Sequence, residues 1–203
     1  MKYYEIKFVL DRLHALVITL DIPIEEIGCC YRIPVYMVDG KKKIILSNNT
    51  VQSDLQTLNS FLMQTLGGDF VLHASIVDDI GYLYNEYYQN KSKYIEVQVG
   101  RVITWVGYKY QLWQAYYRKK RFVTWMYNNV NGDIIFEITP FYPFLFCNPA
   151  QEPNYIIYEE WIKKYKPYFI KIISREIAQQ WLVKSSSILE QIDKNIVRWE
   201  TGQ

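Results

Sequence analysis

YKYQLWQAYYRKKRFVTWMYNNVNGDIIFEITPFY, which spans residues 108–142, is the stretch that decides the fold of this chain. Two turn-like segments, RKKR at 118–121 and NNVNG at 128–132, divide it into three strand-like runs that are rich in aromatic residues. Asn and Gly tolerate a positive φ and so favour a turn between strands. The stretch therefore predicts an antiparallel meander with one strongly apolar face. We expect Trp125 and Phe136 to be buried there and to hold the meander to the helices.

The third run of the meander predicts which side chains face the core. Successive side chains of a strand point to opposite faces, so alternation assigns one set to the core and the other to a wetter side. The expected inward residues are Ile134, Phe136 and Ile138, and the expected wetter residues are Asp133, Glu137 and Thr139. Prolines follow at 140 and 143 and prevent further pairing, because proline lacks a ladder donor.

Local signals outside the meander predict a further hairpin and a helix. Residues 4–10 alternate with period two, which is typical of a half-buried strand. Asp39-Gly40 between two apolar runs is a hairpin signal. Residues 53–66 are predicted to be helical, because Ser53 and Gln56 match a capping box and leucines recur at helical spacing. The glycines at 67 and 68 supply the helix end.

The last third of the chain changes to helical patterns. Residues 155–165 carry aromatic side chains on one side, and Ser174 can cap a final helix with an apolar stripe. Strands precede these helices instead of alternating with them, which favours an α+β organisation over βαβ units. The sequence thus predicts a single α+β domain over residues 1–203. We expect an antiparallel sheet of about five to seven strands with three or four helices packed against it.

Charge and composition narrow the function classes. The formal net charge is +2, whereas a dedicated nucleic-acid binder usually has a stronger basic bias, so nucleic acid is not expected as a partner. The RKKR cluster at 118–121 is interpreted as a solvated hairpin turn. No apolar run approaches the ~20 residues of a membrane helix, and no secretory apolar segment follows Met1. The chain is therefore expected to be cytoplasmic, without a membrane partner.

The cysteines support the same compartment. There are three of them, and an odd count without a disulfide framework favours a reducing environment. Cys29 and Cys30 are adjacent, which is a poor arrangement for an ordinary disulfide between them. We expect these two and Cys147 to be reduced and structural.

Signatures of catalysis and of cofactor binding are missing from the sequence. His14 and His73 are the two histidines, and each lies among apolar neighbours. A metal site would need further ligands at close spacing, and a catalytic triad would need a base near a nucleophile. No phosphate-binding glycine loop is present. We therefore predict no catalytic residue, no metal and no cofactor, and we favour a function that is not enzymatic.

The segment DDIGYLYNEYYQNKSKY, residues 78–94, is the candidate site for a protein partner. Tyrosine gives a large contact area at low entropy cost and is enriched at interfaces. Neighbouring carboxylates would steer a basic partner toward it. The alternative is that these tyrosines pack on the sheet edge. The predicted contact residues are Asp78, Asp79, Tyr82, Tyr84, Glu86, Tyr87 and Tyr88.

Two segments resemble small bacterial immunity-type proteins and their uncharacterised relatives. They are GKKKIILSNNTVQSDLQTLNSFLMQTL at 40–66 and FVTWMYNNVNGDIIFEITPFYP at 122–143. The resemblance implies a cytoplasmic, non-enzymatic α+β domain that neutralises a cognate toxin by binding it, and it assigns no individual functional residue. We therefore expect a protein-binding domain, specifically an immunity protein. The alternatives are a small enzyme whose carboxylates or His73 line a cleft, and a nucleic-acid binder that uses residues 118–121.

Overall fold

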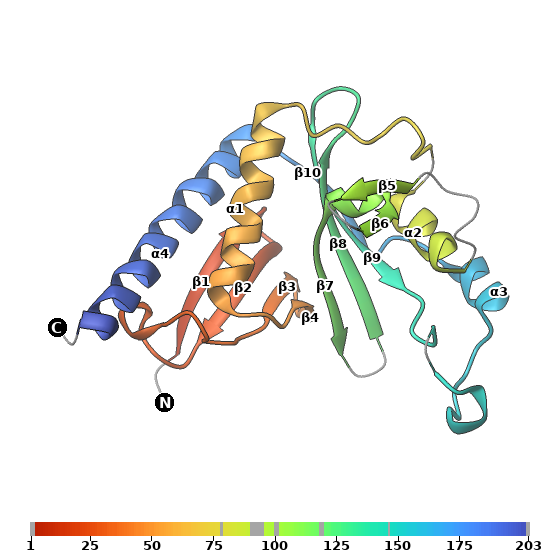
Figure 1. Cartoon of the computed structure of the whole chain (residues 1–203), viewed down its shortest axis with the longest axis horizontal. Coiled ribbons are helices and arrows are strands. Elements are labelled where there is room, and N and C mark those ends of the chain that lie inside the picture. Colours follow the sequence, from red (N-terminus) through yellow and green to blue (C-terminus); the bar gives the residue numbers. More distant parts are fainter. Residues whose placement is uncertain are drawn as a thin grey trace.

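The computed structural model describes residues 3–77, 79–89, 96–99, 102–117, 120–145 and 147–201. These residues form four α-helices and ten strands in antiparallel sheets, which confirms the predicted α+β class. Two four-stranded sheets lie side by side with helices packed on them (Figure 1). Short 3-10 turns at Ile24–Glu26, Val106–Tyr110, Pro149–Gln151 and Ile162–Lys164 connect the larger elements.

The first sheet is a four-stranded meander built from the N-terminal residues. Its strands, in sheet order, are β1 (Tyr4–Val9), β2 (His14–Leu20), β3 (Val35–Asp39) and β4 (Lys42–Ser47). The predicted turn at Asp39-Gly40 joins β3 to β4 and is confirmed. Phe8, Leu16 and Met37 lie on its buried face, whereas Glu5 and Lys7 alternate with them on the other face.

Helices α1 (Val51–Gly67) and α4 (Arg175–Thr201) run side by side across the buried face of this sheet (Figure 1). Leu55, Leu58 and Leu62 of α1 are buried and Leu66 is partly buried, but Ser53 is not the cap of the helix. The helix begins after Thr50, whose side-chain oxygen accepts a hydrogen bond from the Ser53 amide at 3.2 Å. Ser53 cannot be the cap, because it already lies in the first turn of the helix. Its own backbone amide is one of the free donors that the cap has to bond.

Helix α4 begins where the sequence predicts and protects the free edge of β1. The Ser174 hydroxyl accepts from the Ile177 amide at 3.3 Å. One turn further along, Trp181 donates its indole N–H to the Val9 carbonyl at 3.0 Å, and Lys184 donates to the Lys7 carbonyl at 2.7 Å. Edge carbonyls that are bonded in this way are not available for pairing with another chain.

The second sheet contains the meander that decides the fold. Its order is β10 (Phe169–Ile173), β9 (Ile134–Phe141), β8 (Lys120–Asn128) and β7 (Gln111–Tyr117). Trp125 and Phe136 are both 0 % exposed, which confirms the prediction of burial. Trp125 packs on Tyr84 with ring centroids 5.1 Å apart, and Phe136 packs on Trp181 at 6.3 Å, so they hold the meander to helices on its two sides.

The wetter face predicted for β9 is wrong, because both faces of β8 and β9 are covered. Glu137 is 2 % exposed and Thr139 is fully buried. Their face is covered by helix α2 (Ile80–Gln89) and by a two-stranded sheet of β5 (Glu96–Val99) and β6 (Val102–Trp105). Alternation reports the polarity of a strand face, whereas burial depends on what other elements are placed over it.

The number of strands also exceeds the expected five to seven. The ten described strands form sheets of four, four and two strands, and β2 comes from a short apolar run that periodicity alone does not assign. The expected helix at 155–165 is reduced to α3 (Tyr158–Trp161) and the 3-10 turn Ile162–Lys164. Across the described residues, no helix has both the length and the apolar character needed to cross a membrane.

Candidate functional site

Helix α2 carries most of the predicted partner-binding residues and lies directly on β9. Asp79 is the N-cap of the helix: its carboxylate accepts a hydrogen bond from the Tyr82 amide at 2.7 Å, and its carbonyl accepts one from the Leu83 amide at 3.0 Å. Gly81 permits close contact with the sheet, since a Cβ there would lie 2.3 Å from the Thr139 hydroxyl oxygen. The helix therefore approaches the sheet more closely than any larger residue would allow.

Two of the predicted contact residues lie in the core and not on a surface. Tyr84 is 0 % exposed and packs among the rings of Trp105, Trp125 and Phe141. Tyr87 is also buried and donates its hydroxyl to Glu96 at 3.1 Å. The expectation that these two side chains contact a partner is corrected, because a tyrosine ring satisfies an apolar core as well as it satisfies an interface.

The remaining residues of the tract are also engaged within the fold. Glu86 accepts a hydrogen bond from the Tyr158 hydroxyl at 2.6 Å. Tyr88 shares a hydrogen bond with the Tyr108 hydroxyl, and the Tyr82 ring meets the Tyr165 ring edge to face at 5.9 Å. Asp78 lies outside the described residues. The tract therefore packs within the fold, but as a helix over the face of β9 and not along a sheet edge as the alternative has it.

Glu137 on β9, which the sequence predicts on the wetter face, is buried beneath α2, and the pKa of its carboxyl is strongly raised. The Tyr127 hydroxyl donates to Glu137 Oε2 at 2.8 Å. Burial, together with repulsion by the nearby Asp79 carboxylate and a hydrogen bond to it, raises the pKa of Glu137 to about 8, although the hydrogen bond from Tyr127 acts in the opposite direction. The sequence feature that could have indicated a buried acid is the position of Glu137 as the single acidic residue within the apolar run IIFEIT.

The Asp79 carboxylate accepts hydrogen bonds from the Tyr82 amide at the N-terminus of α2 and from the Tyr165 hydroxyl. Glu137 keeps its proton at neutral pH, because a second charge at this depth would be neither solvated nor paired. The arrangement stores a proton below α2, but at 2 % exposure Glu137 is not accessible to a substrate.

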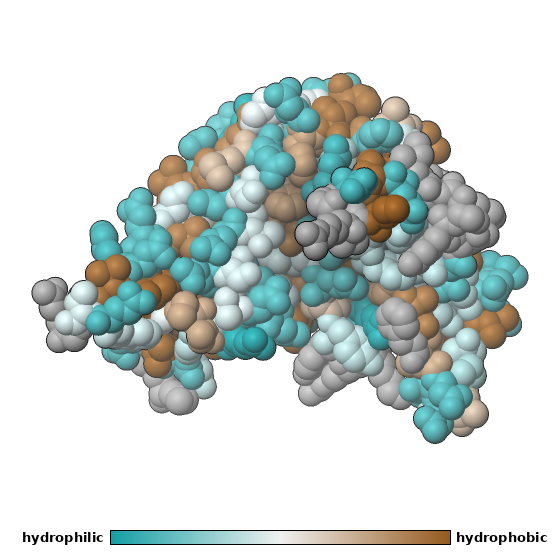
Figure 2. Space-filling view, viewed as in Figure 1, coloured by the Kyte–Doolittle hydropathy of each residue, from teal (hydrophilic) through white to brown (hydrophobic). Residues whose placement is uncertain are grey.

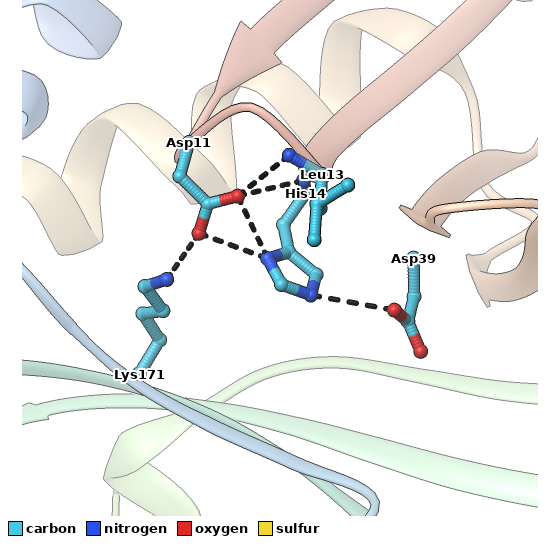
Figure 3. A network of polar contacts seen from close by, with 5 residues as sticks. All are labelled: Asp11, Leu13, His14, Asp39 and Lys171. Atoms are coloured by element: carbon cyan, nitrogen blue, oxygen red, sulfur yellow. Dashed lines mark hydrogen bonds and ion pairs between the residues drawn. The ribbon is translucent and has the colours of Figure 1, made fainter.

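A second polar network joins the two sheets (Figure 3). The Asp11 carboxylate, in the β1–β2 turn, accepts from the Leu13 amide at 2.8 Å, from His14 Nδ1 at 2.8 Å, and from the Lys171 ammonium of β10. The other ring nitrogen of His14 lies 3.3 Å from Asp39. These bonds, led by the one from Lys171, lower the pKa of Asp11 well below its usual range. The network fastens the first hairpin to the edge of the second sheet.

His73, the histidine considered for a catalytic cleft, is exposed. Its Nδ1 lies 2.8 Å from the Ser75 hydroxyl in the loop before α2. It lines none of the hollows found between Pro34 and Phe122, on the open face of the first sheet, along α4, or beside Trp199. None of these four hollows therefore places His73 in a cleft.

A concave feature lined by two lysines from different sheets lies where the two sheets meet. We call it the inter-sheet hollow; its volume is about 540 Å³. Its apolar lining residues are Pro34, Tyr36, Ile44, Ile45 and Phe122, and its polar lining residues are Lys43, Asn48 and Lys120. The Lys43 ammonium lies 5.7 Å from the centre of the Tyr36 ring. No local pattern could have predicted this set, because tertiary packing brings β4 and β8 together.

A neighbouring hollow extends the surface over the open face of the first sheet. It has a volume of about 580 Å³ and shares Lys43 with the inter-sheet hollow. Lys7 and Arg12 also line it, but its carboxylates are engaged, with Glu5 bonded to Lys7 at 2.6 Å. On the opposite side, Figure 2 shows hydrophobic residues scattered among hydrophilic ones over α1 and α4.

Half of the basic cluster at 118–121 belongs to a strand and not to a turn. Residues 118 and 119 lie outside the described part, whereas Lys120 and Arg121 already belong to β8 and pair with Tyr117 and Tyr116. The Arg121 guanidinium lies over the Tyr116 ring at 4.7 Å. Lys120 lines the inter-sheet hollow, so one member of the cluster contributes to a concave surface.

The described residues contain no group of three or more His, Cys, Asp and Glu side chains that could hold a metal ion. Comparisons of the chain with protein families, with curated proteins and with solved structures find no match. The resemblance to immunity-type proteins therefore stays a prediction.

Proposed function

We propose that this protein is a non-enzymatic, cytoplasmic protein-binding domain that holds an acidic segment of its partner in the inter-sheet hollow. One observation carries the proposal. Two lysines, Lys43 and Lys120, come from different sheets and line one hollow together with the rings of Tyr36 and Phe122. Aromatic rings supply contact area at low entropy cost, and cations at the rim select the charge of the partner.

The positive charge of the inter-sheet hollow indicates that the partner is acidic there. Within the described part of the chain, no carboxylate forms an ion pair with Lys43 or Lys120, and none lines the inter-sheet hollow. Arg12 adds a further cation in the neighbouring hollow, where Lys7 is paired with Glu5. A partner with a complementary, acidic surface would therefore associate faster than a neutral one, because opposite potentials steer the encounter.

The size of the hollow indicates an anchor site within a larger contact. A stable interface buries about 800 Å² on each partner, whereas a hollow of about 540 Å³ takes only a few side chains. The open face of the first sheet adjoins the hollow and supplies the remaining area. Binding energy should concentrate in the hollow, where rings and cations converge.

The lining residues favour binding over catalysis. No carboxylate, histidine, cysteine or serine is among them, so the hollow lacks a nucleophile–base pair of the ordinary kind. Glu137 has a strongly raised pKa, but it lies under α2 at 2 % exposure. The perturbed acid and the accessible hollow are thus separate features.

Toxin neutralisation is the more specific form of the proposal. It rests on the resemblance of residues 40–66 and 122–143 to immunity-type proteins, and these two segments contribute Lys43 and Phe122 to the hollow. The structure changes the kind of toxin that would fit. The carboxylates of the tyrosine-rich tract would have steered a basic toxin, whereas the inter-sheet hollow requires an acidic contact surface.

The test uses the protein encoded by the neighbouring gene, because immunity genes sit beside the genes of their toxins. The two proteins are co-purified, and their affinity is measured by calorimetry at low and moderate salt. Lys43→Glu combined with Lys120→Glu should weaken binding at least ten-fold, and the wild-type affinity should fall with salt. Co-expression should also relieve any growth defect that the neighbour causes by itself.

The matched control is Lys194→Glu, which makes the same charge change at an exposed position of α4. It should leave the affinity within about two-fold of wild type. Equal losses in both variants would show only a general charge effect and would overturn the assignment of the hollow. Absence of binding by the neighbour, with turnover of a small substrate by the chain, would overturn the protein-binding proposal.

Single-stranded nucleic acid is the second candidate, because rings beside lysines also suit stacked bases and phosphates. Tyr36, Phe122, Lys43 and Lys120 meet that description, although the net charge is only +2. A labelled oligonucleotide that binds with a steep salt dependence would support this candidate. Such binding should be lost in the double lysine variant and kept in Lys194→Glu.

A further inference from the structure

Cys29 and Cys30 form an exposed pair of thiols in a tight turn. The Tyr31 amide donates to the Gly28 carbonyl at 3.3 Å and closes the turn around the two cysteines. Their sulfur atoms lie 3.5 Å apart, and both residues are exposed. The expectation that every cysteine is structural is therefore wrong for this pair, since neither packs in the core.

Helix α4 fixes the turn in place. A Cβ at Gly28 would lie 2.1 Å from the Trp199 ring, so only glycine allows the ring to lie on the turn backbone. One turn earlier in the helix, Asn195 donates to the Ile24 and Ile27 carbonyls at 2.8 and 3.0 Å. Trp199 and both cysteines line a shallow hollow of about 440 Å³. The thiols are thus held together before any ligand arrives.

A disulfide between the two sulfurs is disfavoured by backbone geometry. Disulfides usually join Cα atoms ~4.4–6.8 Å apart, but neighbouring residues across a trans peptide are ~3.8 Å apart. Closing the bond would bring the sulfurs from 3.5 Å to about 2.05 Å and would strain the turn. An atom that bridges the sulfurs needs no such movement. With bonds of about 2.3 Å, a length typical of thiolate–metal bonds, the bond angle between the two sulfurs at the bridging atom would be roughly 100°.

We propose that Cys29 and Cys30 form a binding site for trivalent arsenic compounds, with both sulfurs bonded to one arsenic atom. An angle near 100° suits pyramidal trivalent arsenic, whose lone pair compresses its bond angles. The third position stays open toward the hollow beside Trp199 and takes the remaining substituent. This inference does not depend on the proposed protein partner.

Other thiophilic ions fit the pair less well. Zinc requires four ligands in a tetrahedron, and the described residues offer no group of three or more suitable side chains. A two-coordinate linear ion such as Cu(I) would need sulfurs on opposite sides, roughly 4.6 Å apart for bonds of about 2.3 Å. The observed separation of 3.5 Å is too short for that arrangement.

The chemistry balances without an oxidant. An arsenoxide, R–As=O, reacts with two thiols: the arsenic–oxygen bonds break, two arsenic–sulfur bonds form, and the two thiol protons leave with the oxygen as one water. Arsenic remains trivalent throughout. The hydrogen bond and the charge of Cys30 raise the pKa of the Cys29 thiol.

The test uses phenylarsine oxide and the full chain. Intact mass should show one adduct per protein, and the number of free thiols should fall from three to one. The adduct should resist a monothiol and be removed by a dithiol such as 2,3-dimercaptopropanol. Cys29→Ser and Cys30→Ser should each abolish the resistant adduct, whereas Cys147→Ser should retain it, and circular dichroism would verify that each variant is folded.

Two further measurements separate the folded geometry from mere adjacency in sequence. The native chain should bind phenylarsine oxide at least ten-fold more tightly than the chain unfolded in urea, because α4 holds the turn in place. Equal affinities, or an adduct that survives Cys29→Ser, would overturn the proposal. Incubation with glutathione disulfide should leave three free thiols after mild reduction by a monothiol; one free thiol would show that the pair closes into a stable disulfide instead.

Discussion

Glu137→Gln should make the protein more stable at alkaline pH and remove part of its pH dependence. Glutamine imitates the protonated acid: its amide oxygen can accept from Tyr127, and its amide nitrogen can donate to Asp79. The wild-type carboxyl must lose its proton as pH rises, and this puts a second charge beside Asp79 in the core. The amide cannot ionise, so the variant avoids this cost.

The sign and magnitude follow from linkage. The folded-state pKa of Glu137 is raised from 4.5 to about 8, so the folded state binds more protons than the unfolded state between those values. Stability from this group is complete below pH 4.5 and is lost as pH rises through about 8. At about 1.4 kcal/mol per pH unit, the loss between pH 5 and pH 8 is about 3–4 kcal/mol.

The assay is urea denaturation of wild type and Glu137→Gln at pH 5, 6, 7 and 8, with unfolding monitored by circular dichroism. The difference between the two unfolding free energies should grow toward pH 8. Taking this difference removes the contribution of the titrating groups that the two proteins share. Glu96→Gln is a control at an acid whose partner is the Tyr87 hydroxyl. A difference between wild type and Glu137→Gln that stays constant within about 0.5 kcal/mol would refute the assignment of a buried proton to Glu137.

Five further substitutions, two of them controls, test the packing and the capping of α1. Trp125→Ala should cost about 3–5 kcal/mol in chemical denaturation, because the side chain is 0 % exposed and bonded to Thr139 at 2.8 Å; a loss below about 1 kcal/mol would contradict its place in the core. Thr50→Ala should cost about 1 kcal/mol of unfolding free energy, and Ser53→Ala distinctly less, because Thr50 is the cap; the reverse order would restore the cap predicted from sequence. Gly81→Ala should lower the melting temperature, since its Cβ would meet Thr139 at 2.3–2.5 Å, whereas Gly67→Ala has open space and should be neutral or stabilising; similar melting temperatures for both variants would show that α2 does not press on β9.

Local chemistry was enough to place the ends of several elements. Asp39-Gly40 predicts its hairpin because the signal is contained in the few residues that form the turn. Ser174 predicts the start of α4 for the same reason, since a cap bonds an amide only a few positions away. The α+β class followed as well, because the order of strands and helices along the chain is itself a sequence property.

The candidate sites were decided by packing between distant segments. Tyrosines of residues 79–89 look alike in sequence whether they face a partner or a core, because the ring is apolar and its hydroxyl is polar. Only the position of α2 over β9 shows that Tyr84 is buried. The inter-sheet hollow likewise exists only because β4 lies beside the second sheet and brings Lys43 near Lys120.

The sequence by itself determined that this chain forms an antiparallel meander with Trp125 and Phe136 buried, because a period of two and turn residues are local properties. The tertiary structure alone decided that the opposite face of β9 is also covered, and that Glu137 keeps a proton there. The physical reason is that a residue's polarity is written in the chain, whereas its solvation depends on which distant element is packed above it. A pKa, an exposed dithiol and a hollow between sheets are all consequences of solvation and proximity, and these arise only when the chain has folded.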